Sequence, residues 1–390
     1  MDTGSKIYMD YAATTPVDPR VVAAMQPYFT GSFGNPSSIH VFGQVAEMAL
    51  EKARQEVAEI IHASPDEIFF TSGGTESDNL ALRGVALARR KLTGADTLLI
   101  SPVEHHAISR TAQQLASEFD FNLEVLPVDQ TGRVDPDEVS RRIGPKTALV
   151  SVIYANNEIG TVNPIGAIGE VCREQGVPLH TDAVQAAAYL PIDVQAAAID
   201  LLSLGAHKFY GPKGVGVLYV RKGTPILPVQ TGGGQEGGLR SGTQNIPYIV
   251  GLAEAFKITQ AEIHSRAARL IPLRDRLIGE VLETISEAAL TGHPAERLPN
   301  HASFVFNHAD GNALVTLLDV AGFACSSGSA CKTGNPEPSE VLTAIGLPRE
   351  WALGSLRITL GTGTTPEHIT AFLKTLPDRV NRSRGMAYRH

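Results

Sequence analysis

Short apolar runs alternate with helix-like segments between residues 68 and 220, and this alternation restricts the possible folds more than any other feature of the sequence. The runs contain many Val, Ile and Leu residues and few charges, as strands do when both faces of their sheet are covered. Strand, helix and strand at this spacing predict a mostly parallel sheet with helices on both faces, an α/β fold. The expected strands are 68–71, 97–100, 123–127, 147–153, 178–181, 199–203 and 215–220, with helices ending near Leu92 and at 106–118, 135–142 and 164–175.

The pattern changes after Val220. Residues 231–243 form a glycine-rich loop, and the segment from Pro247 to Ala288 has almost no helix breaker apart from Pro272. A proline inside a helix removes a hydrogen bond and bends the chain, so we expect one helix kinked at Pro272 or two abutting helices. Further strands are expected near 302–306 and 355–360, and further helices near 311–320 and 366–383.

The chain has 390 residues, which exceeds the usual size of one domain. We predict a large domain at 15–260 and a smaller α+β domain formed by 1–14 together with 261–390. The Cys-, Ser-, Gly- and Pro-rich residues 321–340 are predicted to be a mobile loop of the smaller domain.

The net charge is −8, which argues against nucleic acid or an anionic membrane as the main partner. No apolar run reaches the length of a membrane span, and the first residues lack the pattern of a secretory signal. The three cysteines, Cys172, Cys325 and Cys331, form no CxxC pair and no disulfide framework. These features predict a cytoplasmic protein in a reducing compartment.

Lys208 lies in a turn-rich connection between the apolar runs 199–202 and 215–220, a pattern typical of a hairpin. An amine held there among Gly, Phe and Tyr would be desolvated, which lowers its pKa and makes it a nucleophile. The chemistry that needs such an amine is a Schiff base with pyridoxal phosphate. On this stretch alone, the pattern favours the alternative, a surface lysine in a turn.

A glycine-containing turn, Thr71 to Ser77, joins a predicted strand to a predicted helix. Glycine lets the backbone approach a ligand, and the free N–H groups of a helix N-terminus attract anions, so a phosphate is the natural occupant. The hydroxyl of Thr75, next to Gly74, would add a donor. The alternative is a plain turn with Thr75 as a helix cap.

Asp182 stands at the carboxyl end of the expected strand 178–181. Ligands of open parallel sheets bind at the carboxyl ends of strands. Its carboxylate is suited to pair with a protonated pyridine nitrogen, while Gln185 would reach the phenolic oxygen of the same ring. A helix-capping aspartate is the alternative. A strand-end Asp followed by a hairpin Lys208 fits one ligand held by both residues.

Three further residues follow or lie within predicted strands. His105 is suited to stack on an aromatic ring and to transfer protons near neutral pH. Its neighbour His106 suggests a metal site, but no Cys or acidic residue stands at metal-ligand spacing, so no metal is expected. Asn157 is suited to hydrogen-bond a ring oxygen, and Arg357 to grip a carboxylate, although each is also common as a structural residue.

Cys331 stands among small residues beside Lys332, a setting that favours a reactive thiolate. Cys325 ends a more apolar run and Cys172 lies within a predicted helix. Both are expected to be buried, unreactive core residues.

Taken together and in this order, these stretches resemble the cysteine desulfurases, pyridoxal-phosphate enzymes of aminotransferase class V that supply sulfur for iron–sulfur clusters. The resemblance runs from Tyr8 to about Leu373. It is carried by residues 8–16, 34–38, 71–77, 104–105, 156–160, 182–185, 207–208, 240–243, 326–331 and 356–357.

The resemblance implies fold type I of the pyridoxal-phosphate enzymes, with a seven-stranded type of sheet, and a role for each matched residue. Lys208 would form the Schiff base, Asp182 would face the pyridine nitrogen, and His105 would stack on the ring. Asn157 and Gln185 would hold the phenolic oxygen, and Gly74, Thr75 and His207 would bind the phosphate. Thr243 would reach the phosphate of the neighbouring subunit in a homodimer, Asn35 and Arg357 would hold the substrate carboxylate, and Cys331 would accept the sulfur.

The sequence departs from the family at two positions. Gly205 stands where a phosphate-binding serine is usual, so one hydroxyl donor is missing. Ser203 is two residues earlier and faces the same side of the strand only if no bulge intervenes. Gly237 stands where an arginine is common, so a loop contact of that side chain is missing.

The resemblance implies that L-cysteine is converted to L-alanine with a persulfide on Cys331, for transfer to a scaffold protein in iron–sulfur cluster assembly. Cys331 is also a candidate transient ligand of such a cluster. The alternatives are another class V enzyme, such as a selenocysteine lyase or an aminotransferase, and a sulfur carrier that uses Cys331 without pyridoxal phosphate.

Overall fold

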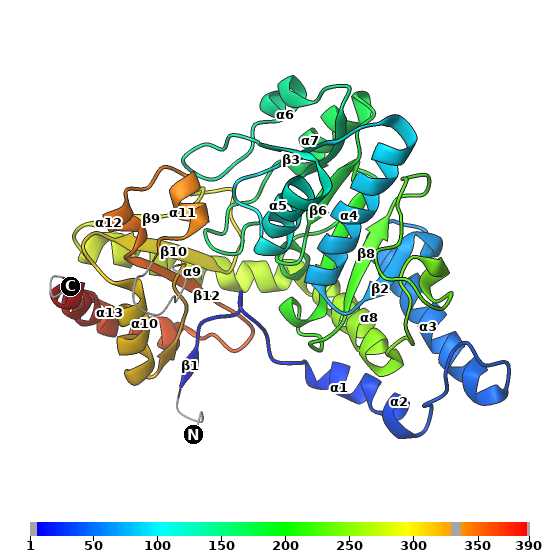
Figure 1. Ribbon diagram of the computed structural model, residues 1–390. Coiled ribbons are helices and arrows are strands. Elements are labelled where there is room, and N and C mark those ends of the chain that lie inside the picture. The colour runs from blue at the N-terminus through cyan, green and yellow to red at the C-terminus, as the bar shows by residue number, and fades with distance from the viewer. Residues whose placement is uncertain (1–5, 329–336, 388–390) are drawn as a thin grey trace.

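The computed structural model describes residues 6–328 and 337–387, and its main element is a sheet of seven strands in the order β2-β8-β7-β6-β5-β3-β4 (Figure 1). β8 pairs antiparallel with both β2 and β7, and the other pairs are parallel. The predicted α/β fold with a mostly parallel sheet is confirmed. The strands are β2 (Ile68–Thr71), β3 (Thr97–Ile100), β4 (Asn122–Val125), β5 (Thr147–Ser151), β6 (Leu179–Asp182), β7 (Leu201–Gly205) and β8 (Gly216–Val220).

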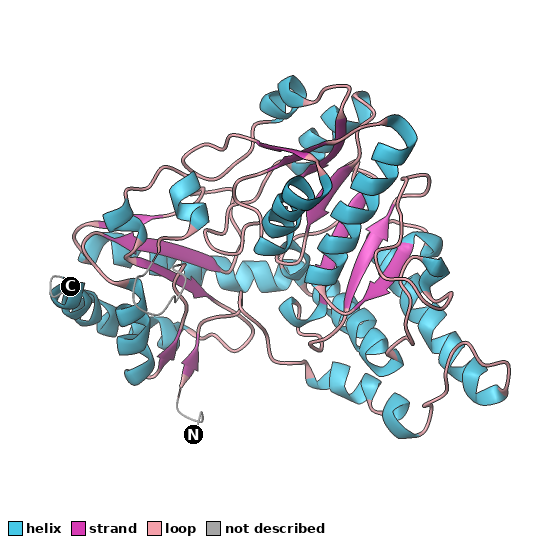
Figure 2. Cartoon of the chain, viewed as in Figure 1, coloured by secondary structure: helices cyan, strands magenta, loops and turns pink. Residues whose placement is uncertain are grey.

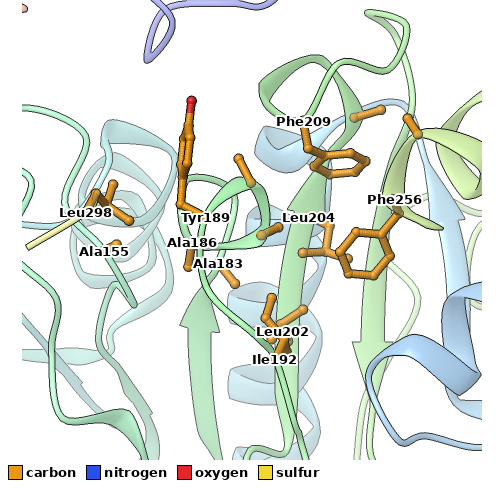
Figure 3. Close-up of a cluster of buried hydrophobic side chains, with 14 of the residues drawn as sticks. Ala155, Ala183, Ala186, Tyr189, Ile192, Leu202, Leu204, Phe209, Phe256 and Leu298 are labelled. Carbon is orange, nitrogen blue, oxygen red and sulfur yellow. The ribbon is translucent and has the colours of Figure 1, made fainter. Parts of the chain in front are cut away.

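Neighbouring apolar residues of β3, β7 and β8 belong to separate apolar clusters, because side chains alternate between the two faces of a sheet. In β3, Leu98 and Ile100 join one cluster while Leu99 joins the other. Each face is therefore buried separately, which explains why the strands read as continuous apolar runs. Figure 3 shows part of the larger cluster, where Leu202 and Leu204 of β7 lie near Phe209 and Phe256.

Helices cover both faces of this sheet (Figure 2). α4 (Gly74–Thr93) and α5 (His106–Phe119) contact each other, and α4 also contacts β5, β7 and β8. α3 (Val41–Ile60) packs against α8 (Ile246–Ala261), and α8 supplies Phe256 to the larger apolar cluster. The remaining helices of this part are α1 (Pro19–Met25), α2 (Pro27–Thr30), α6 (Pro136–Arg142) and α7 (Ile165–Glu174).

A second sheet of three antiparallel strands, in the order β12-β10-β9, lies beyond the first (Figure 1). Strands β9 (Ala288–Leu290), β10 (His301–Phe306) and β12 (Ser355–Thr359) are accompanied by α9 (Ile263–Thr284), α10 (Gly311–Val320), α11 (Glu340–Ala344), α12 (Arg349–Ala352) and α13 (Pro366–Ala387). A separate parallel pair joins β1 (Ile7–Tyr8) to β11 (Phe323–Ala324). The division into domains near residue 260 stays a prediction.

The structure corrects the position of one helix boundary. The long helical segment breaks at Glu262, whose φ of −95° and ψ of 3° end α8, and Pro272 lies inside α9. Two abutting helices were therefore the right alternative. The boundary between them lies at Glu262 and not at Pro272. Among the described residues, no helix is both long and apolar enough to cross a membrane.

Candidate active site

A cavity of about 290 Å³ opens at the carboxyl ends of the parallel strands, where ligands of open α/β sheets bind. The turn after β2, the loop after β5 and the hairpin after β7 all contribute to its wall. Nine of the predicted site residues line it: Gly74, Thr75, His105, Asn157, Asp182, Gln185, His207, Lys208 and Arg357. The fold therefore gathers residues from distant parts of the sequence at one place.

Lys208 ends a short 3-10 turn, Ala206–Lys208, that directly follows β7. Because β7 and β8 pair antiparallel, the predicted hairpin is confirmed and its connection holds the lysine in place. The Nζ atom donates hydrogen bonds of 2.7 Å to the backbone oxygens of both Ala12 and Ala13. Burial, with Arg357 nearby, lowers the pKa of Lys208 to about 8, so a substantial fraction of the amine is neutral near physiological pH.

Asp182 is the last residue of β6 and is only 4% exposed. The backbone N–H of Val184 donates to its Oδ1 atom at 2.9 Å. Burial raises the pKa of Asp182, while His105 and Lys208 favour its charged form. A cationic ring nitrogen placed against this carboxylate would likewise stabilise the negative charge.

Asp78 of α4 is a cavity residue that the sequence analysis missed. Its side chain is buried, and its Oδ1 atom has no hydrogen-bond partner in the described part of the chain. Burial and the nearby Asp182 raise the pKa of Asp78 well above its ordinary value, which favours the neutral carboxyl. Ligand atoms of Asp78, His105 and Asp182 all lie within 4.8 Å of one another, a grouping that sequence spacing did not reveal.

His105 caps the N-terminus of α5, and its Nδ1 atom accepts a hydrogen bond of 3.1 Å from the backbone N–H of Ala107. In the neutral ring the proton therefore resides on Nε2. Burial lowers the pKa of His105, so the neutral ring is favoured. A neutral imidazole on the cavity wall is suited to stack on a flat ligand.

The preceding residue, Glu104, is buried beneath the cavity wall. Its Oε1 atom accepts hydrogen bonds of 2.6 Å from both the hydroxyl of Ser101 and the backbone N–H of Ile153. Burial raises the pKa of Glu104 to about 8. Glu104 thus joins β3 to β5 immediately before His105.

The N-terminus of α4 forms one end of the cavity. Gly74 begins the helix, and a Cβ atom there would lie 2.7 Å from Cγ2 of Val184, so only glycine fits without a shift. His207 also lines the cavity, and its Nδ1 atom lies 3.1 Å from the hydroxyl oxygen of Thr14. Burial and the charge of Lys208 lower the pKa of His207 to about 4. The free backbone N–H groups of the helix favour an anion at this end.

The departure at Gly205 is not compensated by Ser203. The Oγ atom of Ser203 is buried and lies 3.0 Å from Nε2 of His180, and Ser203 does not line the cavity. At Gly205 a Cβ atom would meet its nearest neighbour, the backbone nitrogen of Gly74, at 3.5 Å, an ordinary contact. A serine would therefore fit beside the helix N-terminus.

Arg357 of β12 enters the cavity from the second sheet. Its Nη1 atom donates to the backbone oxygen of Asn157 at 3.0 Å, and its Nη2 atom donates to Oδ1 of Asp10 at 2.9 Å. The Nε donor is buried and has no hydrogen-bond partner among the described residues. A guanidinium in this position is suited to bind a carboxylate.

The N-terminal segment forms part of the cavity wall, a role that the sequence analysis did not predict. Ala12 and Ala13 line the cavity, and their backbone oxygens accept hydrogen bonds from Lys208. The Nε2 atom of Gln185 also donates to the oxygen of Ala12 at 2.8 Å. The signal in the sequence is the pair of small residues, which lets the backbone approach Lys208 closely.

Three predicted site residues are not at the cavity. Asn35 is exposed, and its Oδ1 atom accepts from the backbone N–H of Ser37 at 2.9 Å. Thr243 is exposed as well. Cys331 lies outside the described residues, as does part of the predicted loop 321–340, and the loop's described residues Phe323 and Ala324 form strand β11.

The other two cysteines are buried, as expected from their apolar surroundings. Burial raises the pKa of the Cys172 thiol to about 12 and that of the Cys325 thiol also to about 12. Neither forms a thiolate near neutral pH. The second departure, Gly237, adopts a φ of 61°, a conformation that an arginine would adopt only with strain.

The chain matches the model of the aminotransferase class-V family over residues 7–372. It is 46% identical over 381 residues to a cysteine desulfurase IscS of Methanosarcina thermophila, covering 98% of this chain and 93% of the relative. It is 44% identical to cysteine desulfurase IscS 1 of Archaeoglobus fulgidus, covering 97% of this chain and 98% of that one.

Solved structures agree with these relatives. A NifS-like protein superposes with a TM-score of 0.89 at 37% identity, covering 97% of this chain and 100% of that chain. A NifS-like protein from Rickettsia africae superposes with a TM-score of 0.85 at 29% identity, covering 96% of this chain and 99% of the other. The chain therefore belongs to the aminotransferase class-V family and, within it, to the cysteine desulfurases.

Proposed function

We propose that this protein uses pyridoxal phosphate to convert L-cysteine to L-alanine, placing the released sulfur on Cys331 as a persulfide for an acceptor protein of iron–sulfur cluster assembly. One observation carries the proposal: Lys208, with a pKa lowered to about 8, and the buried carboxylate of Asp182 line the same cavity. The amine of Lys208 suits the aldehyde group of pyridoxal phosphate, and the carboxylate of Asp182 suits its ring nitrogen.

The residues of the cavity fit the cofactor. The N-terminus of α4, with Gly74 and Thr75, would hold the phosphate together with His207, which lines the same cavity. Asp182 would hold the ring nitrogen, His105 would cover the ring, and Asn157 and Gln185 would reach its oxygen. When bound, pyridoxal phosphate supplies an electron sink for the charge left on the α-carbon of the substrate.

The chain's own residues supply the remaining chemistry. Arg357 would bind the substrate carboxylate, and the neutral amine of Lys208 would accept the α-proton. The Cys331 thiolate would then attack the substrate sulfur, so that a sulfur–sulfur bond forms and the carbon–sulfur bond breaks. The carbon side keeps the electron pair and is protonated, giving alanine and one persulfide for each cysteine consumed.

A homodimer is part of the proposal, with Thr243 and Asn35 acting across the subunit interface. The residues on both sides of Asn35 support it, because they expose an unusual amount of apolar surface. Ile39 is 93% exposed and Phe33 is 65% exposed, and the exposed side chains of Val41, Phe42 and Met48 continue the patch. Patches of this kind mark protein interfaces.

The test is incubation of the purified protein with L-cysteine, with and without a scaffold protein, followed by measurement of alanine, sulfide and protein persulfide. Cys331→Ser should keep the colour of the bound cofactor and bind cysteine, yet form no persulfide. The matched control is Cys172→Ala, which alters a buried cysteine and should keep persulfide formation. A persulfide that remains on Cys331→Ser contradicts the assignment, and activity that survives alkylation favours an aminotransferase.

A further inference from the structure

One carboxylate connects the cavity to the segment that leads to Cys331. The Oδ1 atom of Asp10 accepts from Nη2 of Arg357 at 2.9 Å, and its Oδ2 atom accepts from the hydroxyl of Ser326 at 2.7 Å. The side chains of Arg357 and Asp10 are only 12% and 15% exposed. Asp10 therefore makes one contact with a cavity residue and another with a residue five positions before Cys331 in the sequence.

The backbone around these side chains is firmly paired. Ser326 and Arg357 exchange backbone hydrogen bonds of 3.3 and 2.7 Å. Met9, next to Asp10, donates to the oxygen of Ala324 and accepts from the N–H of Thr359, each at 2.8 Å. The contacts that can change without breaking this pairing are those of the three side chains.

The guanidinium of Arg357 has limited room for a second anion. Nη1 is used by the backbone oxygen of Asn157 and Nη2 by Asp10, which leaves the buried Nε without a partner among the described residues. An arriving carboxylate would meet the like charge of Asp10 on the same guanidinium, and two carboxylates sharing one cation repel each other. Release of Asp10 from the guanidinium removes this repulsion, so a two-pronged grip on the newcomer is favoured once Asp10 withdraws.

We propose that Asp10 is a positioning residue that occupies Arg357 until a substrate carboxylate replaces it. This exchange is coupled to the hydrogen bond that the hydroxyl of Ser326 donates to Asp10. The inference rests on the proposed function, in which Arg357 binds the substrate carboxylate. The coupling is reciprocal, as linkage requires: carboxylate binding weakens the Asp10–Ser326 contact, and loss of that contact favours carboxylate binding.

The test uses the holoenzyme and L-alanine, a carboxylate ligand without the reactive sulfur, with affinity read from the visible absorbance of the cofactor. Asp10→Asn keeps the shape but removes the competing charge, so the Kd for L-alanine should fall by about threefold or more. Ser326→Ala removes the donor that holds Asp10 in place, so it should also lower the Kd, although Ser326 does not line the cavity.

The double variant separates coupling from two independent effects. In the Asp10→Asn background, Ser326→Ala should leave the Kd unchanged. Ser327→Ala is the matched control, because the hydroxyl of Ser327 donates instead to Oδ1 of Asn312 at 2.9 Å, and it should behave as the unaltered protein.

Equal effects of Ser326→Ala in both backgrounds, or no effect in either, overturn the coupling. If Asp10→Asn does not fold, an unchanged Kd in Ser326→Ala alone is sufficient to overturn it. A holoenzyme that does not respond to L-alanine but still converts cysteine to alanine overturns the coupling and leaves the proposed function standing. Failure to convert cysteine at all instead contradicts the proposed function.

Discussion

The side-chain nitrogen of Lys208 donates a 2.7 Å hydrogen bond to the backbone oxygen of Ala12, which lies 196 positions away in the sequence. The contact joins the hairpin of the seven-stranded sheet to the N-terminal segment. The carbonyl oxygens of Ala12 and Ala13 stabilise the charged amine, whereas burial and Arg357 oppose the charge. Burial has the larger effect, and the pKa falls to about 8.

Capture of pyridoxal phosphate by the cofactor-free protein should depend on this pKa. Only the neutral amine attacks the aldehyde, so the capture rate should rise with pH and level off above about 8. The rate can be followed by the cofactor's absorbance between pH about 6 and 10, with Lys208→Ala as the control that captures nothing covalently. A rate that keeps rising to the ordinary lysine pKa of about 10.4 contradicts the lowered value.

The two buried carboxyl groups of the cavity should respond differently to the same substitution. Asp182→Asn removes the charge proposed to face the ring nitrogen. Loss of one partner of a buried pair costs about 3–5 kcal/mol, so kcat/KM should fall more than about 100-fold. Asp78→Asn replaces a carboxyl whose neutral form is favoured by burial, so kcat/KM should change by only a few-fold. Steady-state kinetics with L-cysteine compare the two, and equal losses would refute the assignment.

Glu104 should make stability depend on pH. Its pKa rises from 4.5 in the unfolded chain to about 8 in the folded protein. Between these values the folded state binds the extra proton, so stability falls as the pH rises, by at most about 1.4 kcal/mol per pH unit. Glu104→Gln removes this titration.

The check is the difference in Tm between Glu104→Gln and the unaltered protein. The variant should gain relative stability from pH about 5 to pH about 8 and show no further gain above that. A difference that is constant over this range would mean that Glu104 is ionised in the folded protein.

Gly205→Ser should strengthen binding of pyridoxal phosphate. The site has room for a Cβ atom, and the added hydroxyl would lie beside the N-terminus of α4. A hydrogen bond to a charged group contributes about 1.5 kcal/mol, roughly tenfold in Kd. Equilibrium dialysis of the cofactor measures this, and Gly205→Ala, which adds the Cβ atom without the hydroxyl, is the control. Equal affinities of the two variants would show that the hydroxyl finds no phosphate.

Ile39→Glu should disrupt the proposed homodimer. The substitution places a charge on the most exposed apolar side chain of the patch near Asn35, where an interface would have to bury it. Sedimentation should show a dimer for the unaltered protein and a monomer for the variant. Leu92→Glu alters an apolar residue that is 68% exposed elsewhere on the surface, and it should stay dimeric. A monomeric unaltered protein would refute the proposal.

Local patterns were sufficient for most of the secondary structure. The strand expected at 97–100 is β3, and the helix expected at 106–118 is α5, because short apolar runs and helical periodicity are properties of consecutive residues. The helix boundary expected near Pro272 was wrong, because this proline is accommodated within α9. The boundary lies at Glu262, where the sequence contains no strong helix breaker.

The α/β order of strands and helices and the motif residues could be predicted from residue type and spacing. Three other features became visible only in the folded chain: Asp78 lies close to Asp182, Ala12 and Ala13 accept hydrogen bonds from Lys208, and Asp10 joins Arg357 to Ser326. Burial and pairing of this kind arise between segments that are distant in the sequence. The pKa of a carboxyl or an amine follows from those neighbours, which no local pattern contains.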